Sequence, residues 1–233
     1  MTTGRDVGVV IVAGGSGSRV GGRELKQFRW VAGKPMLLHS LQTFMARPDV
    51  VSVVCVLPSS HAADPPPWIF QCDVDRLMIS VGGQTRQQSA ANGLEDLPDE
   101  AQIVLIHDAA RPLVTDQAIS RVIDATRRDG AAIAALPVAD TLKEVDAEQR
   151  VGKTIDRARL WRAQTPQGFR RDLIVRAHRE GARAKVEATD DAALCERLGI
   201  SVTVVRGSER AMKVTEESDF ERAAAMVDLP DEG

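Results

Sequence analysis

The sequence predicts an α/β protein built on an open, doubly wound, mostly parallel sheet with a projecting β-arm. Two observations carry this prediction. Apolar, β-branched runs recur along the chain, as at residues 7–12, and such runs are typical of strands buried on both faces of a parallel sheet. Helical stretches separate them, and strand after helix after strand is the order of a doubly wound sheet. We expect residues 1–233 to form one domain, since 233 residues suffice for one large core.

The first half of the chain follows this alternation. A glycine-rich loop at 14–18 follows the first strand. Lys34-Pro35 opens a helix that extends to about residue 46, because Pro is tolerated near a first turn. Three consecutive prolines should prevent regular structure across 61–68. The other elements expected here are strands at 50–57, 77–81 and 103–106, the last ending at His107-Asp108, and a helix at 84–95 after the break at Gly82-Gly83.

The second half contains one interruption. A helix at 115–128, with Thr115 as its N-cap, leads to a strand at 131–138. Residues 139–161 then contain short extended pieces, at 141–145, 151–154 and 159–161, joined by a polar turn, and these predict the β-arm. An exposed hairpin is marginally stable alone, so a partner subunit is one surface on which it would pack. The remaining elements expected are helices at 170–180, 190–198 and 216–227 and a strand at 202–205.

The composition argues against several classes of function. The formal net charge is −3, from 30 Lys and Arg against 33 Asp and Glu, so we expect neither nucleic acid nor a membrane as partner. Tyr is absent and aromatic residues make up 3%, which argues against stacking platforms for single strands. No run reaches the roughly 18 apolar residues of a membrane span, and no signal peptide is evident. Three cysteines without C-x-x-C spacing predict reduced thiols, a cytoplasmic protein and no zinc site.

Four segments that follow predicted strands are expected to form one ligand crevice. In open α/β sheets, ligands bind at the carboxyl ends of the strands, where loops from distant parts of the sequence meet. The segments are 13–26, 82–89, 107–112 and 137–143.

The first of these segments favours a polyphosphate. Its glycines let the backbone approach a ligand and turn N–H groups toward phosphate. Gly17-Ser18-Arg19 does not match the Gly-Lys-Ser/Thr of a P-loop, and Val20 stands where a dinucleotide-binding loop has its third glycine. Arg19 and Lys26 supply two cations beside the loop. An ordinary strand-to-helix loop with solvated charges is the alternative.

The segment from His107 to Pro112 places an aspartate at the end of a buried strand. Asp108 would enter the crevice and bind a metal–phosphate unit or a sugar hydroxyl, or it would cap a helix or turn. Arg111 would bind a substrate phosphate or pair with Asp108. We interpret His107 as structural, because no Ser or Cys nucleophile pattern accompanies it.

Motifs in the same order along nearly the whole chain resemble the 2-C-methyl-D-erythritol 4-phosphate cytidylyltransferase family of nucleotidyltransferases. The most specific are His107-Asp108-Ala109-Ala110-Arg111-Pro112 and Gln164-Thr165-Pro166-Gln167, together with the terminal Lys213-Val214-Thr215. The opening motif, Val12 to Arg19 followed by Lys26-Gln27-Phe28, is shared with sugar-nucleotide pyrophosphorylases and is less specific. The other matches are Gly82-Gly83 with Arg86 and Ser89, Asp140-Thr141-Leu142-Lys143, Arg157 and Thr189-Asp190-Asp191.

The resemblance implies a Rossmann-like nucleotidyltransferase fold and a reaction. CTP and 2-C-methyl-D-erythritol 4-phosphate give 4-diphosphocytidyl-2-C-methyl-D-erythritol and pyrophosphate, with Mg²⁺, on the non-mevalonate route to isoprenoid precursors. By resemblance, the catalytic residues are Arg19, Lys26, Arg157 and Lys213; the nucleotide-binding residues are Ala13, Gly14, Gly15, Gly17, Gly83, Ser89 and Asp108; and the substrate-binding residues are Arg111, Thr141, Thr165, Thr189 and Glu209. Asp108 is also the candidate Mg²⁺ ligand, with the triphosphate holding most of the ion.

The resemblance further implies a homodimer. The arm at 139–161 would join two subunits, and Thr141 and Arg157 would reach the partner's active site. The C-terminal part departs from the family pattern at Ala211, which stands where the family usually has Asn. The family usually has an acidic residue nearby, and Glu209 is the candidate for it. The alternatives are a ribitol-5-phosphate cytidylyltransferase, which would share the nucleotide half, and a non-catalytic nucleotide-binding protein.

Overall fold

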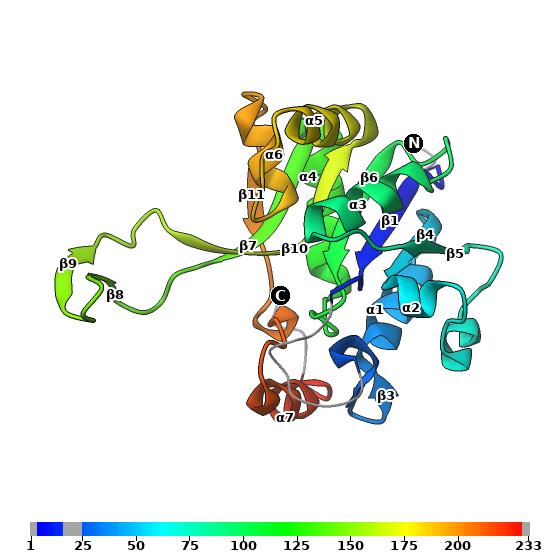
Figure 1. Cartoon of the computed structure of the whole chain (residues 1–233), viewed down its shortest axis with the longest axis horizontal. Coiled ribbons are helices and arrows are strands. Elements are labelled where there is room, and N and C mark those ends of the chain that lie inside the picture. The colour runs from blue at the N-terminus through cyan, green and yellow to red at the C-terminus, as the bar shows by residue number, and fades with distance from the viewer. Residues whose placement is uncertain (1–3, 16–24, 230–233) are drawn as a thin grey trace.

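A seven-stranded sheet forms the centre of the molecule in the computed structural model, which describes residues 4–15 and 25–229 (Figure 1). Within it, β10 is antiparallel to both of its neighbours, and all other neighbouring strands are parallel. The predicted mostly parallel α/β sheet is therefore confirmed. From edge to edge the strands are β11 (Thr203–Arg206), β7 (Ala131–Pro137), β10 (Trp161–Arg170), β6 (Ile103–Asp108), β1 (Val7–Val12), β4 (Val50–Leu57) and β5 (Leu77–Val81).

The ten-residue strand β10 differs from the sequence prediction. We expected extended structure at 159–161 as part of the arm, and no strand beyond it. Trp161 instead begins a strand that inserts between β6 and β7. Pro166 and Gly168 lie within it, and both residue types are depleted in strands, so its local sequence is a poor guide. Pairing with two neighbours stabilises this strand where its own propensity does not.

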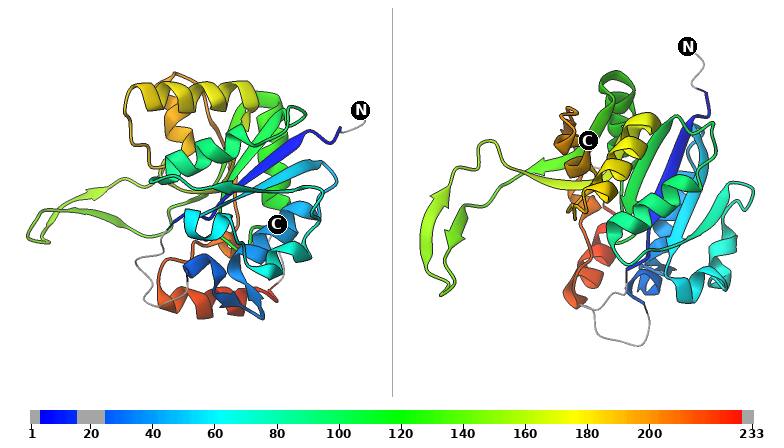
Figure 2. Two further views of the ribbon diagram at one scale, coloured as in Figure 1. Left: turned by 45° about the vertical axis from the view of Figure 1, so that its right-hand side comes forward. Right: turned by 45° about the horizontal axis from the view of Figure 1, so that its top comes forward.

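Helices cover both faces of the sheet (Figure 2). On one face the core joins α1 (Met36–Met45) and α4 (Asp116–Asp129) to Val9 and Ile11 of β1. On the other face it joins α3 (Arg86–Glu95), α5 (Arg171–Arg183) and α6 (Asp191–Arg197) to Val10. Alternate residues of β1 thus face opposite cores, which is why its sequence is continuously apolar.

Two helix boundaries refine the sequence predictions. Thr115 caps α4 as predicted, its hydroxyl oxygen accepting a hydrogen bond from the N–H of Ala118 at 3.2 Å. The helix expected from Lys34 begins at Met36 instead, because β3 (Lys34–Pro35) pairs with β2 (Trp30–Val31).

The proline-rich stretch also contains more regular structure than predicted. A short helix, α2 (Ser59–Ala62), overlaps the start of this stretch, and a 3₁₀ turn, η2 (Pro67–Gln71), overlaps its end. The expectation of irregular structure throughout 61–68 was therefore wrong. Pro67 lies in the first turn of η2, where the missing N–H of proline removes no helical hydrogen bond.

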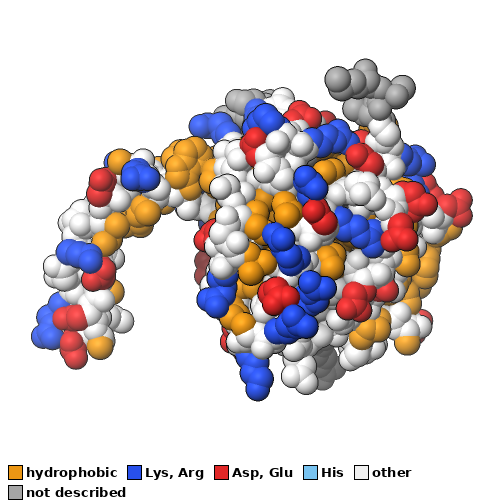
Figure 3. Space-filling model, turned by 90° about the horizontal axis from the view of Figure 1, so that it is seen from above, with side chains coloured by type: hydrophobic (Ala, Val, Ile, Leu, Met, Phe, Trp, Pro, Cys, Tyr) orange, Lys and Arg blue, Asp and Glu red, His pale blue; other side chains and the backbone are white. Residues whose placement is uncertain are grey.

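The predicted arm projects from the side of the sheet in every view (Figures 1–3). Its tip is a two-stranded antiparallel sheet of β8 (Leu142–Val145) and β9 (Val151–Ile155). Apolar and charged side chains are mixed along it (Figure 3). Val145 and Val151 are 54% and 62% exposed, so the hairpin has no core of its own.

The C-terminal helix α7 (Glu217–Met226) closes the structure below the carboxyl ends of the central strands (Figure 1). A separate apolar cluster holds it there, with Val31 and Met36 from the N-terminal half and Val214 and Phe220 from the C-terminal segment. This cluster brings η1 (Lys26–Phe28) and η3 (Glu209–Ala211) to the same end of the sheet. No helix in the described part of the chain combines the length and apolar character needed to cross a membrane.

Candidate active site

A cleft of about 680 Å³ opens at the carboxyl ends of β1 and β6. Three of the four predicted crevice segments contribute to its described lining. The segment 137–143, at the base of the arm, does not. The lining consists of Val12, Ala13, Gly14, Gly15, Lys26, Gln27, Met36, Gly83, Gln84, Thr85, Arg86, Ser89, Asp108, Ala109, Ala110, Lys213 and Thr215.

Gln27 holds the backbone of the opening loop in place. Its side-chain amide donates to the carbonyl oxygens of Ala13 at 2.7 Å and Gly15 at 3.1 Å. Gln27 is 5% exposed, so these bonds are shielded from competing water. Its motif suggested no separate role for this residue. The predicted contributions of Gly17 and Arg19 lie outside the described residues.

Ser89 connects α3 to the second glycine-containing loop. Its hydroxyl accepts a hydrogen bond from the N–H of Gly83 at 3.1 Å and donates one to the carbonyl of Thr85 at 2.9 Å. This loop passes so close to the opening loop that a Cβ on Gly14 would lie 2.9 Å from the Ser89 oxygen. A larger residue at Gly14 would push the two loops apart, so both glycine and serine shape this wall of the cleft.

Asp108 stands between two cations at the floor of the cleft. Arg86 donates from Nε to Oδ1 at 2.8 Å, and Nζ of Lys213 lies 2.8 Å from Oδ2. Burial opposes ionisation of this carboxyl, but the charges of Arg86 and Lys213 outweigh it and hold the pKa of Asp108 well below its usual range. The carboxylate is therefore negatively charged at neutral pH. Both carboxylate oxygens bond cations, so these contacts do not support a capping role for Asp108.

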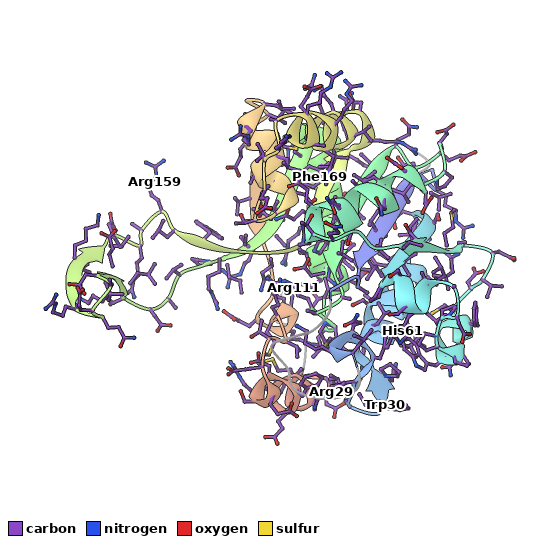
Figure 4. All side chains as sticks on the ribbon, viewed as in Figure 1. Arg29, Trp30, His61, Arg111, Arg159 and Phe169 are labelled. Atoms are coloured by element: carbon purple, nitrogen blue, oxygen red, sulfur yellow. The ribbon has the colours of Figure 1, made fainter. Side chains whose placement is uncertain are left out.

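Arg111 does not form the pair with Asp108 that we considered. Its guanidinium donates instead to the carbonyl oxygens of Ala211 at 2.7 Å and Ala163 at 3.2 Å. Figure 4 shows Arg111 near the C-terminal segment. Arg111 thus ties β10 to η3, and Arg86, for which we predicted no individual role, takes its place beside Asp108.

Lys26 also lines the cleft and contacts the C-terminal segment. Its Nζ donates to the carbonyl of Val214 at 2.8 Å, next to Lys213. The opening motif and the terminal motif therefore meet through this bond. Two lysines from opposite ends of the chain are brought to one cleft, which raises the local density of positive charge.

His107 and Thr165 support Asp108 from behind. The ring donates from Nε2 to the carbonyl of Arg111 at 3.1 Å, so Nδ1 accepts from the Thr165 hydroxyl at 3.0 Å. The same hydroxyl oxygen accepts the N–H of Asp108 at 3.0 Å. Burial lowers the pKa of His107 to about 4, so the ring is neutral, in agreement with a structural role. Thr165 is 4% exposed.

Arg111 and Thr165 are not among the described residues that line the cleft, and neither are the four remaining predicted site residues. Thr189 is exposed and precedes Asp190, the N-cap of α6. Glu209 forms an exposed ion pair with Arg162 at 2.8 Å. Thr141 and Arg157 are exposed at the two sides of the arm, where Arg157 donates to the carbonyl of Ala139.

Comparison with known protein families identifies the chain. The family model for 2-C-methyl-D-erythritol 4-phosphate cytidylyltransferase, IspD, matches residues 7–228. The chain belongs to this family. The family membership confirms the resemblance inferred from the motifs and the assignment of the chain as a nucleotidyltransferase enzyme.

Individual cytidylyltransferases of this family agree with the assignment. The chain is 41% identical, over 94% of each protein, to a 2-C-methyl-D-erythritol 4-phosphate cytidylyltransferase of Syntrophus aciditrophicus. It is 47% identical to a bifunctional enzyme IspD/IspF of Rhodospirillum rubrum, covering 93% of this chain and 56% of that protein. The crystal structure of the Thermus thermophilus cytidylyltransferase superposes with a TM-score of 0.82 at 35% identity, covering 96% of this chain and all of the other.

The described donors of the cleft fit a divalent cation that is held together with substrate phosphates. Among residues 4–15 and 25–229, no group of three or more His, Cys, Asp or Glu side chains is placed to hold a metal. Asp108 supplies one carboxylate, and each of its oxygens keeps a lone pair beyond the bond it accepts. Mg²⁺ is commonly bound by one or two carboxylates with substrate phosphates and waters, which matches this donor set.

Proposed function

We propose that this chain joins CTP to 2-C-methyl-D-erythritol 4-phosphate, giving 4-diphosphocytidyl-2-C-methyl-D-erythritol and pyrophosphate for isoprenoid precursor synthesis. The family supplies the reaction. The observation that carries the proposal within this chain is the pairing of Asp108 with Arg86 and Lys213 in a cleft that Lys26 and a glycine-containing backbone loop also line. Such a cleft suits a triphosphate, since cations and backbone N–H groups both stabilise phosphate charge.

The chemistry requires no strong base. A phosphate oxygen of methylerythritol phosphate attacks the α-phosphorus of CTP, the bond from that phosphorus to the bridging oxygen breaks, and pyrophosphate leaves. The attacking phosphate is already an anion, so catalysis consists of positioning and charge stabilisation. Lys26, with Arg19, stabilises the charge that develops on the triphosphate, and Lys213 orients the attacking phosphate.

The glycine-containing walls of the cleft select and hold the nucleotide. Ala13, Gly14, Gly15 and Gly17 present backbone groups to CTP, and Gly83 with Ser89 forms the edge against which the cytosine fits. Support comes from the bonds that fix these loops: Gln27 to the opening loop, and Ser89 to Gly83. Fixed backbone donors discriminate bases better than mobile side chains, because their geometry costs no ordering on binding.

Mg²⁺ completes the site together with CTP. Asp108 and the triphosphate would hold it, and when bound it neutralises phosphate charge and orients the phosphates for displacement. We also propose a cytoplasmic location, supported by three cysteines that are free thiols.

Methylerythritol phosphate would lie where two subunits meet. Arg111, Thr165, Thr189 and Glu209 belong to the subunit that binds CTP, and Thr141 and Arg157 reach in from the arm of a second copy. The arm's exposed apolar side chains, Val145, Val151 and Trp161 at its base, support a homodimer, because a hairpin without a core is stabilised by packing on a partner.

Pyrophosphate release tests the proposal directly. The assay compares methylerythritol phosphate with ribitol 5-phosphate, each with CTP and Mg²⁺. Release with methylerythritol phosphate alone supports the proposal. Release with ribitol 5-phosphate alone would make ribitol 5-phosphate the substrate, and the assignment of the nucleotide site would stand. CTP binding without release from either would support a non-catalytic protein.

A further inference from the structure

A network of charged side chains extends from the floor of the cleft into the helices that cover one face of the sheet. Arg86 divides its guanidinium between two carboxylates, with Nε 2.8 Å from Oδ1 of Asp108 and Nη1 2.8 Å from Oδ2 of Asp191. The other oxygen of Asp191 accepts a hydrogen bond from Nε2 of His178 at 3.0 Å. The four residues come from β6, α3, α6 and α5, and those three helices cover the same face of the sheet (Figure 1).

Three of these four charged side chains are buried. Asp191 is 1% exposed, His178 6% and Asp108 8%. Removing charges from water is costly, and buried ion pairs often contribute no more to stability than apolar residues of similar volume. Burial opposes ionisation of Asp191, but the hydrogen bond from His178 and the charge of Arg86 outweigh it, and the pKa of Asp191 is lowered. The negative charge opposite Arg86 is therefore maintained.

The geometry of Arg86 depends on both carboxylates together. Its Nη2 is buried and has no hydrogen-bond partner among the described residues, so the guanidinium is oriented by its bonds to Asp108 and Asp191 alone. A planar fork can bridge two carboxylates in this way. The single ammonium of a lysine presents a point charge and does not reproduce that geometry.

A separate set of hydrogen bonds, made by Gln167 on β10, fixes the start of α6. The N–H groups of Asp191 and Ala192 donate to Oε1 of Gln167, at 3.1 and 3.0 Å, and Gln167 donates in turn to Asp190 at 2.8 Å. Thr189 immediately precedes this anchored turn. Through its bonds to Asp108 and Asp191, Arg86 connects the floor of the cleft to this anchored turn and so to the segment that carries Thr189.

We propose that Arg86 is a positioning residue that, supported by Asp191 and His178, holds Asp108 toward Lys213 and keeps the Thr189 segment in register with the bound nucleotide. This inference rests on the proposed cytidylyl transfer. Misalignment of reacting groups by about 1 Å can lower a rate by about 100-fold. Removing a hydrogen bond from this network should therefore lower kcat, although Asp191 and His178 do not touch the substrates.

The test compares Asp191→Asn, Arg86→Lys and the double variant in the assay with CTP and methylerythritol phosphate. We expect Asp191→Asn to lower kcat by about 10- to 100-fold. The KM for methylerythritol phosphate should rise more than the KM for CTP, because Asp191 lies in the turn that follows Thr189, a predicted contact of methylerythritol phosphate. Arg86→Lys should have a similar effect. The double variant should lose little more than either single variant, because the two residues act as one unit.

Arg171→Lys is the matched structural control. Arg171 is also a half-buried arginine, at 23% side-chain exposure against 27% for Arg86, but its bonds go to the carbonyls of Leu97 and Pro98, outside the lining of the cleft. This control should lower the melting temperature and leave kcat unchanged. If Asp191→Asn does not fold, His178→Leu against His178→Gln, which keeps a donor toward Asp191, takes its place. We expect the Gln variant to retain more of kcat.

Three results would overturn the inference. They are a folded Asp191→Asn protein with kcat within about twofold of wild type, a double variant with fully additive losses, and a loss of kcat in Arg171→Lys equal to that in Asp191→Asn. Failure of the proposed function would look different, because the unsubstituted protein itself would then release no pyrophosphate from methylerythritol phosphate.

Discussion

Asp108 and Lys213 form an ion pair of 2.8 Å although 105 positions separate them in the sequence. Asp108 ends a central strand, and Lys213 lies between η3 and α7. The apolar cluster that contains Leu113, Val214 and Phe220 brings the two segments together. The position of a charged side chain in the cleft thus depends on hydrophobic packing outside it.

Lys26→Ala should lower kcat by about 10²- to 10³-fold, the usual loss when one preorganised donor to a developing charge is removed. The lysine also donates to Val214, so we expect an additional loss of about 1 kcal/mol in the free energy of unfolding. Lys34→Ala is the control, since Lys34 donates to a surface glutamine and is not among the residues that line the cleft. Turnover and urea unfolding are measured for both. Normal turnover in folded Lys26→Ala would contradict the catalytic role.

Ser89→Ala should raise the KM for CTP about tenfold and reduce the preference for CTP over UTP. The change leaves the partly buried N–H of Gly83 without its partner, and the loss of one hydrogen bond costs about 0.5–1.5 kcal/mol. Ser52→Ala is the control, because Ser52, on β4, is also buried and its hydroxyl contacts the carbonyl of Arg76 instead. Initial rates with CTP, UTP, ATP and GTP check the prediction. Equal turnover of all four by the unsubstituted protein would show that this loop selects no base.

Arg157→Ala should inactivate the active site of the partner subunit, into which Arg157 is proposed to reach. Mixed with Lys26→Ala subunits, it should recover about a quarter of wild-type activity, since about half of randomly paired dimers are hybrids with one intact site. Arg159→Ala is the control on the same arm, and Figure 4 shows that Arg159 points outward. Activity after subunit exchange is measured, with the oligomeric state determined by light scattering. Exchange without recovery would argue against action across a dimer.

His39 should make the folded protein less stable in weak acid. Burial lowers its pKa; the bond to the Val31 carbonyl opposes this effect and the charge of Lys34 adds to it. The unfolded chain then binds a proton near pH 6.5 that the folded chain does not, so the free energy of unfolding falls as pH drops below about 6.5. Urea unfolding of His39→Gln, which keeps a donor but does not titrate, should show a shallower decrease. An unchanged pH dependence would contradict the assignment.

Most of the fold could be predicted because local pattern determined it. The continuous apolar runs of β1 and β4 and the cap at Thr115 are visible in consecutive residues. Strand β10 was not predictable in this way. Its polar residues, with Pro166 and Gly168, acquire strand geometry from hydrogen bonds to β6 and β7, which lie far away in the sequence.

The candidate site also contains residues that the sequence predicted and residues that only the structure identifies. Loops that follow buried strands must gather at one edge of the sheet, so the positions of Gly14, Gly83 and Asp108 followed from their place in the sequence. The roles of Gln27 and Arg86 had no such local signal. Each is identified by the groups it contacts: Gln27 by two backbone carbonyls, and Arg86 by Asp108 and Asp191.

The amino-acid sequence alone therefore predicted the sheet, the family and the end of the sheet at which the cleft opens, because hydrophobic periodicity and motif spacing are properties of neighbouring residues. The three-dimensional packing decided which charges meet: Lys213 with Asp108, Arg86 with Asp191, and Lys26 with the Val214 carbonyl. Hydrogen bonds and close ion pairs act over a few ångströms, and separation along the chain does not determine which groups come that close.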